Sequence, residues 1–189
     1  MENYRDYLAS FGIMMNDDDW AVYEPRIIKK SFKKNDIITK QGTVENYISL
    51  VESGVARLYL EKEDKEITVD FAFENGYVTA YESFLTREPS GYTIEALTDI
   101  VLWRASHDSF LHFFDHTSIG NFIGRVSAEM LYLVKAKREL SFMTETAEER
   151  YLNLLKQQPN LLQRVPLKYI ASYIGVTPQA LSRIRARIN

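Results

Sequence analysis

The chain has 189 residues, of which 46% are hydrophobic and 26% charged, a composition typical of a globular protein with a buried core. It contains no cysteine, which excludes disulfides, thiolate nucleophiles, cysteine-ligated zinc and iron–sulfur clusters. There is no 18-residue apolar run and no basic, apolar leader at residues 1–6. We therefore expect a cytoplasmic protein with no membrane span and no signal peptide.

The formal net charge of −3 is unevenly distributed along the chain. Residues 151–189 carry six basic side chains and no acidic one, whereas the rest carries 17 basic residues against 26 acidic ones. A basic end on an acidic body favours binding to a polyanion. A solvated basic surface is the alternative interpretation of the same count.

The first half of the chain changes from helical to β-type patterning. In residues 1–30 the apolar positions lie three and four apart, which predicts short helices, and residues 16–19 form a cluster typical of a helix start. Short β-rich runs separated by turn signals then cover residues 37–38, 48–51, 55–60, 67–71 and 92–96. Many short strands at such spacing predict a barrel or sandwich.

After Ser106 the pattern becomes helical. Apolar residues alternate at spacings of four and three, with Lys137 at one step, in the series Ile119, Ile123, Val126, Met130, Leu133 and Leu140. A single helix after a closed β-domain has little of that domain left to cover. We therefore expect these residues to pair with a second copy of the chain, with packing on the chain's own domain as the alternative.

The C-terminal segment predicts two short helices joined at a glycine. A capping box at Thr146 first starts a helix that runs to about residue 158. The next helix covers about 166–174, Gly175 allows the positive φ of a tight turn, and Thr177 caps a last helix whose first residue is Pro178. Small or apolar residues stand where the two helices would face each other: Ile170, Ala171, Ile174, Val176, Leu181 and Ile184. This matches the helix-turn-helix template, and an ordinary helical hairpin is the alternative.

The outward face of the last helix carries hydrogen-bonding and basic side chains, namely Gln179, Ser182, Arg183 and Arg187. Arginine and glutamine suit guanine and adenine edges in the major groove, and arginine also suits phosphates.

The chain from about residue 25 to 189 resembles the Crp/Fnr family of bacterial transcription regulators. The resemblance lies in Ile38 and Gly42, in the stretch 47–57 with Gly54 and Arg57, in residues 127–130 and most strongly in residues 166–188. It implies an α+β fold: a cyclic-nucleotide-binding-like sensor β-roll at 1–115, a dimerisation helix at 116–143 and a winged-helix-like helix-turn-helix domain at 144–189. The wing would be reduced, because the stretch 161–165 is very short.

The resemblance also implies a function and its residues. A homodimeric, cytoplasmic transcription regulator would bind double-stranded DNA, and RNA polymerase is a further partner that the family allows. The family's base-reading positions fall on Pro178, Gln179, Ser182 and Arg183; proline cannot donate a hydrogen bond, so we expect Gln179 and Arg183 to read bases. The full expected DNA-binding set is Lys168, Thr177, Gln179, Ser182, Arg183, Arg185 and Arg187. The dimerisation set is Ile119, Ile123, Val126, Met130 and Leu133.

The cyclic-nucleotide motifs of the family are altered here. Where a Gly-Glu pair holds the ribose, the chain has Ala80 and Tyr81, and where Arg-Ser-Ala holds the phosphate it has residues 90–92, with Arg87 out of register. We therefore expect neither cyclic AMP nor cyclic GMP, and either another small ligand or none. The candidate lining residues are Tyr59, Tyr81, Glu82, Tyr92 and Thr93, whose alternative role is simple packing.

No catalytic or metal motif stands out. His107, His112 and His116 all follow the last predicted strand, and the pair spaced four apart lacks a third ligand, so we expect no haem, no metal and no other cofactor. We find no HExxH, nucleophile elbow or phosphate-binding glycine loop, so we do not expect an enzyme. The alternative function is a ligand-sensing module whose C-terminal helices dock a protein partner.

Overall fold

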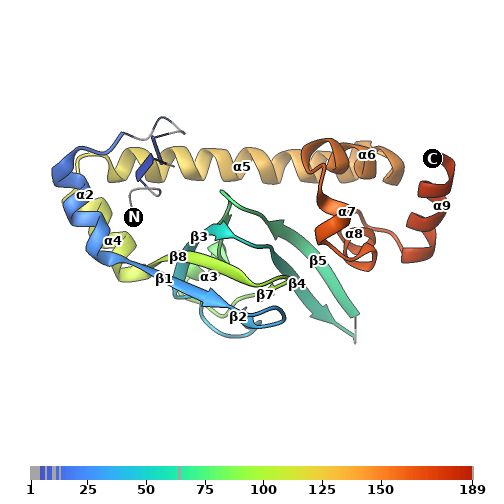
Figure 1. The fold of residues 1–189 in the computed structure, drawn as a ribbon, viewed down its shortest axis with the longest axis horizontal. Coiled ribbons are helices and arrows are strands. Elements are labelled where there is room, and N and C mark those ends of the chain that lie inside the picture. The colour runs from blue at the N-terminus through green and yellow to red at the C-terminus, as the bar shows by residue number, and fades with distance from the viewer. Residues whose placement is uncertain (1–4, 7, 10–11, 13, 64, 189) are drawn as a thin grey trace.

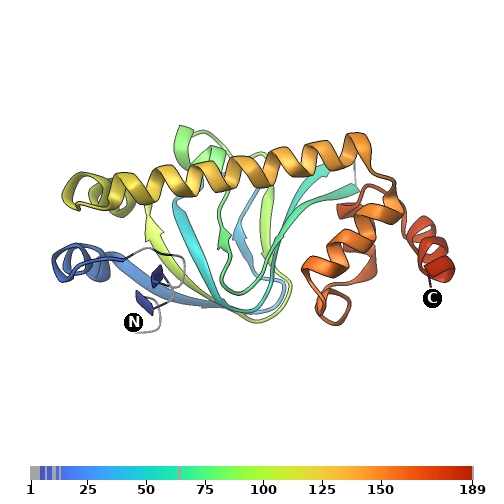
Figure 2. The same cartoon turned by 90° about the horizontal axis from the view of Figure 1, so that it is seen from above.

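The computed structural model describes residues 5, 6, 8, 9, 12, 14–63 and 65–188. A long helix, α5 (Gly120–Thr144), runs beside a β-roll, with the helices α6 to α9 at one end and α2 and α4 at the other (Figures 1 and 2). This arrangement confirms the predicted α+β fold class.

The β-roll consists of two four-stranded antiparallel sheets, in the orders β1-β8-β3-β6 and β2-β7-β4-β5. Their bounds are β1 (Ile27–Phe32), β2 (Ile37–Thr39), β3 (Tyr47–Ser53), β4 (Ala56–Lys62), β5 (Lys65–Ala72), β6 (Tyr77–Val78), β7 (Thr93–Ala96) and β8 (Ile100–Ser106). All five predicted runs are strands, whereas β1, β6 and β8 were not predicted. Between the sheets lies a buried cluster that includes Val51, Leu58, Ile94, Ile100 and Leu102. Apolar residues fill the roll interior because alternate side chains of each strand point inward.

The N-terminal helices pack against the start of α5. In α2 (Asp17–Tyr23) the N-cap Asn16 accepts a hydrogen bond from the Asp19 backbone N–H, as the predicted helix start requires. The buried Asp19 carboxylate in turn accepts bonds from the backbone N–H and hydroxyl of Ser118, at 2.8 Å each. A 3₁₀ turn (Glu24–Arg26) links α2 to β1, and α4 (His107–His116) follows β8.

Two glycines let α5 approach α4 closely. A Cβ on Gly120 would lie 2.7 Å from the Phe113 carbonyl oxygen, and one on Gly124 would lie 2.7 Å from the Phe114 ring. Ile119 immediately precedes the helix, and both it and Ile123 pack on the cluster around Phe113. The N-terminal end of α5 is therefore fixed to its own domain.

Four helices form the C-terminal unit: α6 (Ala147–Gln157), α7 (Leu161–Arg164), α8 (Leu167–Tyr173) and α9 (Pro178–Ile188). The predicted capping box of α6 is present, because Thr146 and Glu149 each bond the other's backbone N–H. The single turn α7 occupies the stretch in which a reduced wing was expected. One buried cluster, which includes Tyr151, Leu161, Ile170, Leu181 and Ile184, holds the four helices together.

Candidate nucleic-acid interface

Helices α8 and α9 form a helix-turn-helix. Gly175 adopts a φ of +79°, and the backbone N–H groups of Gly175 and Val176 donate to Ser172 and Ala171 carbonyls at 3.1 and 2.9 Å. Ile170, Ala171, Ile174, Leu181 and Ile184 are all buried between the helices and the domain. The turn and its apolar positions therefore agree with the sequence prediction.

The start of α9 is capped as predicted. The Thr177 hydroxyl oxygen accepts a hydrogen bond from the Ala180 backbone N–H at 3.2 Å, and Pro178 is the first helical residue. The Thr177 side chain is thereby used in the cap, which fixes the direction in which the first turn of α9 projects.

The outward face of α9 is open to solvent. Gln179, Ser182 and Arg183 are exposed, and spacings of three and four place them on one side of the helix. The Ser182 hydroxyl donates to the Pro178 carbonyl at 3.0 Å, whereas Gln179 and Arg183 make no side-chain hydrogen bond or ion pair to any described residue. In both ribbon views α9 lies at the end of the molecule away from the sheets (Figures 1 and 2).

The remaining basic residues of the predicted set differ in exposure and partners. Lys168 on α8 is exposed, and its ammonium lies 4.7 Å from the Tyr169 ring centroid. Arg185 is half-buried, and Arg187 pairs with the Glu148 carboxylate of α6 at 3.1 Å. Sequence reasoning missed Glu148, because it lies just before the acid-free stretch and meets Arg187 only in the folded structure.

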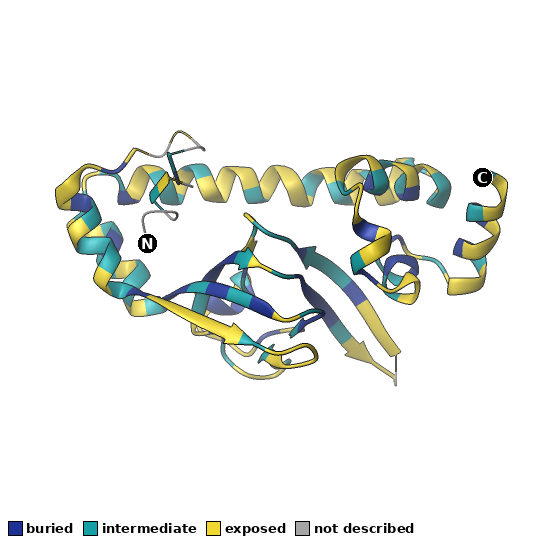
Figure 3. Ribbon diagram, in the orientation of Figure 1, coloured by how far each residue is buried: buried dark blue, intermediate teal, exposed yellow. Residues whose placement is uncertain are grey.

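The middle of α5 is largely exposed (Figure 3), and several of its exposed residues are apolar. Met130, Leu133 and Leu140 are 58%, 64% and 59% exposed. Phe122, which is 50% exposed, falls on the same side at about 100° of rotation per residue and was not in the predicted series. Of the predicted dimerisation set, Ile119 and Ile123 pack on the chain's own domain and Val126 is half-buried, so the series is open to a partner mainly from Met130 onward.

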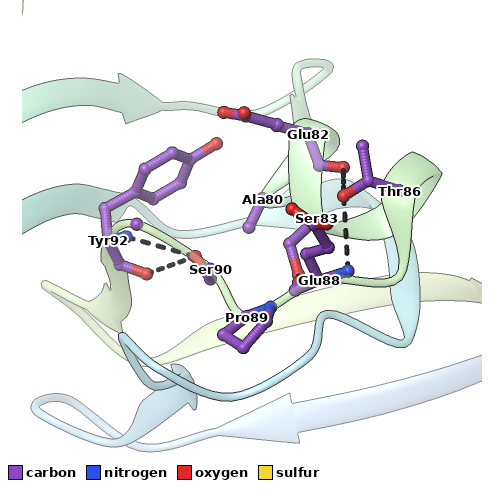
Figure 4. A pocket seen from close by; sticks show the side chains of 9 residues that line it. Ala80, Glu82, Ser83, Thr86, Glu88, Pro89, Ser90 and Tyr92 are labelled. Atoms are coloured by element: carbon purple, nitrogen blue, oxygen red, sulfur yellow. Dashed lines mark hydrogen bonds between the residues drawn. The ribbon is translucent and has the colours of Figure 1, made fainter.

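A small pocket lies in the segment between β6 and β7, which contains α3 (Tyr81–Thr86) (Figure 4). Its volume is about 150 Å³, below the roughly 300–1,000 Å³ of typical ligand pockets. The acidic residues Glu82 and Glu88 belong to its lining, and no described arginine or lysine does; the lining comprises Ala80, Glu82, Ser83, Thr86 and residues 88–92. An anionic phosphate would meet acidic rather than basic groups here.

Only two of the five predicted ligand residues, Glu82 and Tyr92, line this pocket. Burial raises the pKa of Tyr92 to about 12, and its hydroxyl donates to the Thr79 carbonyl at 3.4 Å. The Thr93 hydroxyl accepts from the Gln41 backbone N–H, and Tyr59 stacks on Arg57 with 4.4 Å between the guanidinium carbon and the ring centroid. Neither residue, nor Tyr81, borders the pocket.

Arg87 is used in the structure of the roll itself. Its guanidinium donates to the Glu45 carbonyl and the Asn46 side chain at 2.6 Å each, so it fixes the turn before β3. The His112 and His116 rings stack at 3.8 Å, and no group of three potential metal ligands occurs in the described part of the chain.

Comparison with known proteins identifies the fold of this chain. Residues 29–117 match the cyclic nucleotide-binding domain. FixK2 from Bradyrhizobium japonicum is 17% identical, with a TM-score of 0.72 over 86% of this chain and 84% of that one. CLP from Xanthomonas campestris, a c-di-GMP-responsive global regulator, is 13% identical, with a TM-score of 0.69 over 92% and 91%. A protein from Eubacterium rectale assigned to the Crp/Fnr regulators is 20% identical, with a TM-score of 0.69 over 97% and 87%.

The chain thus combines a cyclic-nucleotide-binding-type β-roll, a long helix and a helix-turn-helix. It has the fold of the Crp/Fnr transcription regulators, as the sequence motifs indicated. No curated protein sequence matches it significantly. Among the described helices, none is both long and apolar enough to cross a bilayer.

Proposed function

We propose that this protein is a homodimeric transcription regulator that reads DNA with α9. The observation that carries the proposal is the open face of α9, on which Gln179 and Arg183 are exposed and have no side-chain partner among the described residues. An arginine fork fits the O6 and N7 of guanine, and a glutamine amide fits the N6 and N7 of adenine. Lys168 on α8 and Arg185 and Arg187 further along α9 suit phosphate contacts, which position a protein without specifying sequence.

The exposed apolar residues on α5 support the proposed dimerisation. Met130, Leu133 and Leu140 expose apolar surface that a second copy would remove from water, and a two-fold axis would set the two copies of α5 against each other. The two copies of α9 would then lie at the same end of the dimer, as binding to two half-sites in successive major grooves requires.

A protein-docking role for the C-terminal helices has less support. A docking helix usually presents an apolar outer face. No large apolar residue of α9 is among the exposed ones, and the described outer face is polar or basic.

The test is selection of DNA by the 189-residue chain from a random duplex library, followed by affinity measurements at several salt concentrations. We expect enrichment of an inverted repeat whose half-sites lie about one helical turn, roughly 34 Å, apart. Affinity should fall steeply with salt, because bound phosphates release counterions. Failure to enrich any sequence, together with binding that does not depend on salt, would refute the proposal.

A further inference from the structure

A buried arginine of the β-roll lies at the junction with the helix-turn-helix. Arg57 in β4 has 0% of its surface exposed. Its Nη1 donates to the Glu66 and Glu95 carboxylates at 2.6 and 3.1 Å, and its Nε donates to the Thr68 hydroxyl at 3.0 Å. Its Nη2 is buried and has no acceptor among the described residues, which is costly for a polar group.

An aromatic ring of the C-terminal unit covers this arginine. The guanidinium carbon lies 3.6 Å from the ring centroid of Tyr169 in α8 and 4.4 Å from that of Tyr59. Stacking on aromatic faces suits the flat, weakly hydrated guanidinium. Arg57 belongs to the roll and Tyr169 belongs to α8, so their contact connects the two units.

A second ion pair joins the same two units at another point. The Arg164 guanidinium of α7 donates two bonds to the Glu74 carboxylate, which follows β5, at 2.7 and 2.6 Å. The bidentate geometry fixes direction as well as distance.

Between these two points α8 lies along β5. The Ser172 hydroxyl accepts from the Thr68 backbone N–H at 2.9 Å, and the Tyr173 and Phe71 rings lie 5.3 Å apart. Val55 of the roll belongs to the same buried cluster as Ile170.

We propose that these contacts form a clamp, here called the β5–α8 clamp (Arg57, Tyr169, Glu74, Arg164 and Ser172), that holds α9 in its DNA-reading orientation. The proposal rests on the proposed DNA-binding function. Because α8 and α9 share a buried core and a short turn, fixing α8 on the roll also fixes α9. Arg57, Tyr169 and Arg164 are positioning residues, since none of them lies on the outward face of α9.

The clamp also connects the roll interior to α9 over a short path. Arg57 points outward between Ala56 and Leu58, which belong to the interior cluster, and Glu95 lies likewise between Ile94 and Ala96. The inner faces of β4 and β7 therefore line the roll interior. The outer faces of the same two strands carry Arg57 and Glu95. A change in the packing of the interior would reach α8 through these strands, in addition to any path along α5.

A distance measurement tests the clamp without DNA. The chain has no cysteine, so Ser31→Cys on β1 and Ala186→Cys on α9, both exposed, can carry spin labels on an otherwise unlabelled protein. Dilution with excess unlabelled protein isolates distances within one subunit. We expect a narrow distribution in the parent, clear broadening with Tyr169→Leu or Arg164→Met, and no broadening with Tyr169→Phe, which keeps the ring. A broad distribution in the parent, or unchanged widths in both disruptive variants, would overturn the clamp.

Binding to the selected duplex supplies the functional readout. If loss of the clamp leaves about a third of the subunits correctly oriented, only about a tenth of the dimers have both subunits in that orientation, so Tyr169→Leu should weaken binding about tenfold while Tyr169→Phe stays near the parent. Lys29→Met, which removes the Lys29–Glu52 ion pair within one sheet of the roll, is the control for Arg164→Met and should leave affinity unchanged. If the parent selects no duplex, the proposed function fails while the distance measurement still tests the clamp. If the parent binds and Tyr169→Leu binds equally well, the clamp proposal fails alone.

Discussion

The arginines of α9 differ in their partners, and we expect their substitutions to affect DNA binding differently. Arg183 has no ion-pair partner among the described residues, whereas Arg187 pairs with Glu148. We expect Arg183→Ala to cost roughly 1–3 kcal/mol on the selected site and to relax preference at one base pair per half-site. Arg187→Ala should weaken binding to all sequences alike and reduce the salt slope by about one per subunit. Fluorescence anisotropy on selected and random duplexes distinguishes the two. Equal losses on both duplexes for both variants would show that Arg183 reads no base.

The turn glycine gives a prediction about stability. Gly175 has a φ of +79°, and a Cβ there would lie 2.8 Å from the Phe142 ring. Gly175→Ala should therefore lower the unfolding free energy by about 1 kcal/mol or more, because alanine is strained at positive φ. Gly91→Ala is the matched control, since a Cβ at Gly91 would meet no atom of the described residues within 4 Å. Urea denaturation followed by circular dichroism measures both, and equal stability of the two variants would contradict the expectation.

Glu74 gives the clamp a pH dependence. The hydrogen bonds from Arg164 are the largest cause that lowers the pKa of Glu74 from 4.5 to about 2. A lowered carboxyl pKa stabilises the folded state above pH 4.5, and this stabilisation is lost as the pH falls toward 2. Glu74→Gln should therefore be less stable than the parent at pH 6 and should lose less stability on acidification. Thermal melts across this range test it, with Glu52→Gln as the control for loss of a paired carboxylate elsewhere. If the melting temperatures of Glu74→Gln and the parent change equally with pH, the ionised Glu74 carboxylate does not stabilise the folded state.

At the scale of whole elements, α5 makes the clearest prediction. Met130 is 58% exposed on α5, so Met130→Glu would place a charge in the proposed dimer seam. We expect monomers by analytical ultracentrifugation and a loss of affinity for the inverted repeat. Ala128→Glu, about 200° around the helix from Met130, should remain dimeric. A parent protein that is monomeric at all concentrations would refute the seam itself.

The sequence predicted some elements better than others. The difference depends on whether neighbouring residues carry a clear pattern for the element. The helix-turn-helix was predicted because its caps, turn glycine and apolar spacing are all local. The strand β6 has two residues and β1 carries exposed lysines, so neither has the alternation of a half-buried strand. The apolar run of β8 was overlooked, although its buried, alternating residues were a usable signal.

In the candidate site, too, residues set by local spacing were predicted and partners distant in sequence were not. The outward face of α9 follows from helical spacing, so Gln179, Ser182 and Arg183 were found correctly as an exposed group. The partners of Arg57 and Arg164 could not be found that way, because Glu74 precedes Arg164 by 90 residues. The role of Tyr59 was also beyond a sequence argument. Which face of β4 turns toward α8 depends on how the two units pack.

For the whole molecule, the question is what the β-roll senses. The fold is that of a cyclic nucleotide-binding domain, but the pocket lining includes Glu82 and Glu88 and no described basic residue. A cyclic phosphate would lack a cationic partner and would meet like charge. We therefore expect cyclic AMP at millimolar concentration to change neither the melting temperature nor the affinity for the selected duplex. A ligand that binds the native state must raise its stability by mass action, so differential scanning fluorimetry is a direct test. A rise of several degrees that is abolished by a substitution in the pocket, such as Ser90→Trp, would show that the pocket binds the nucleotide despite its acidic lining.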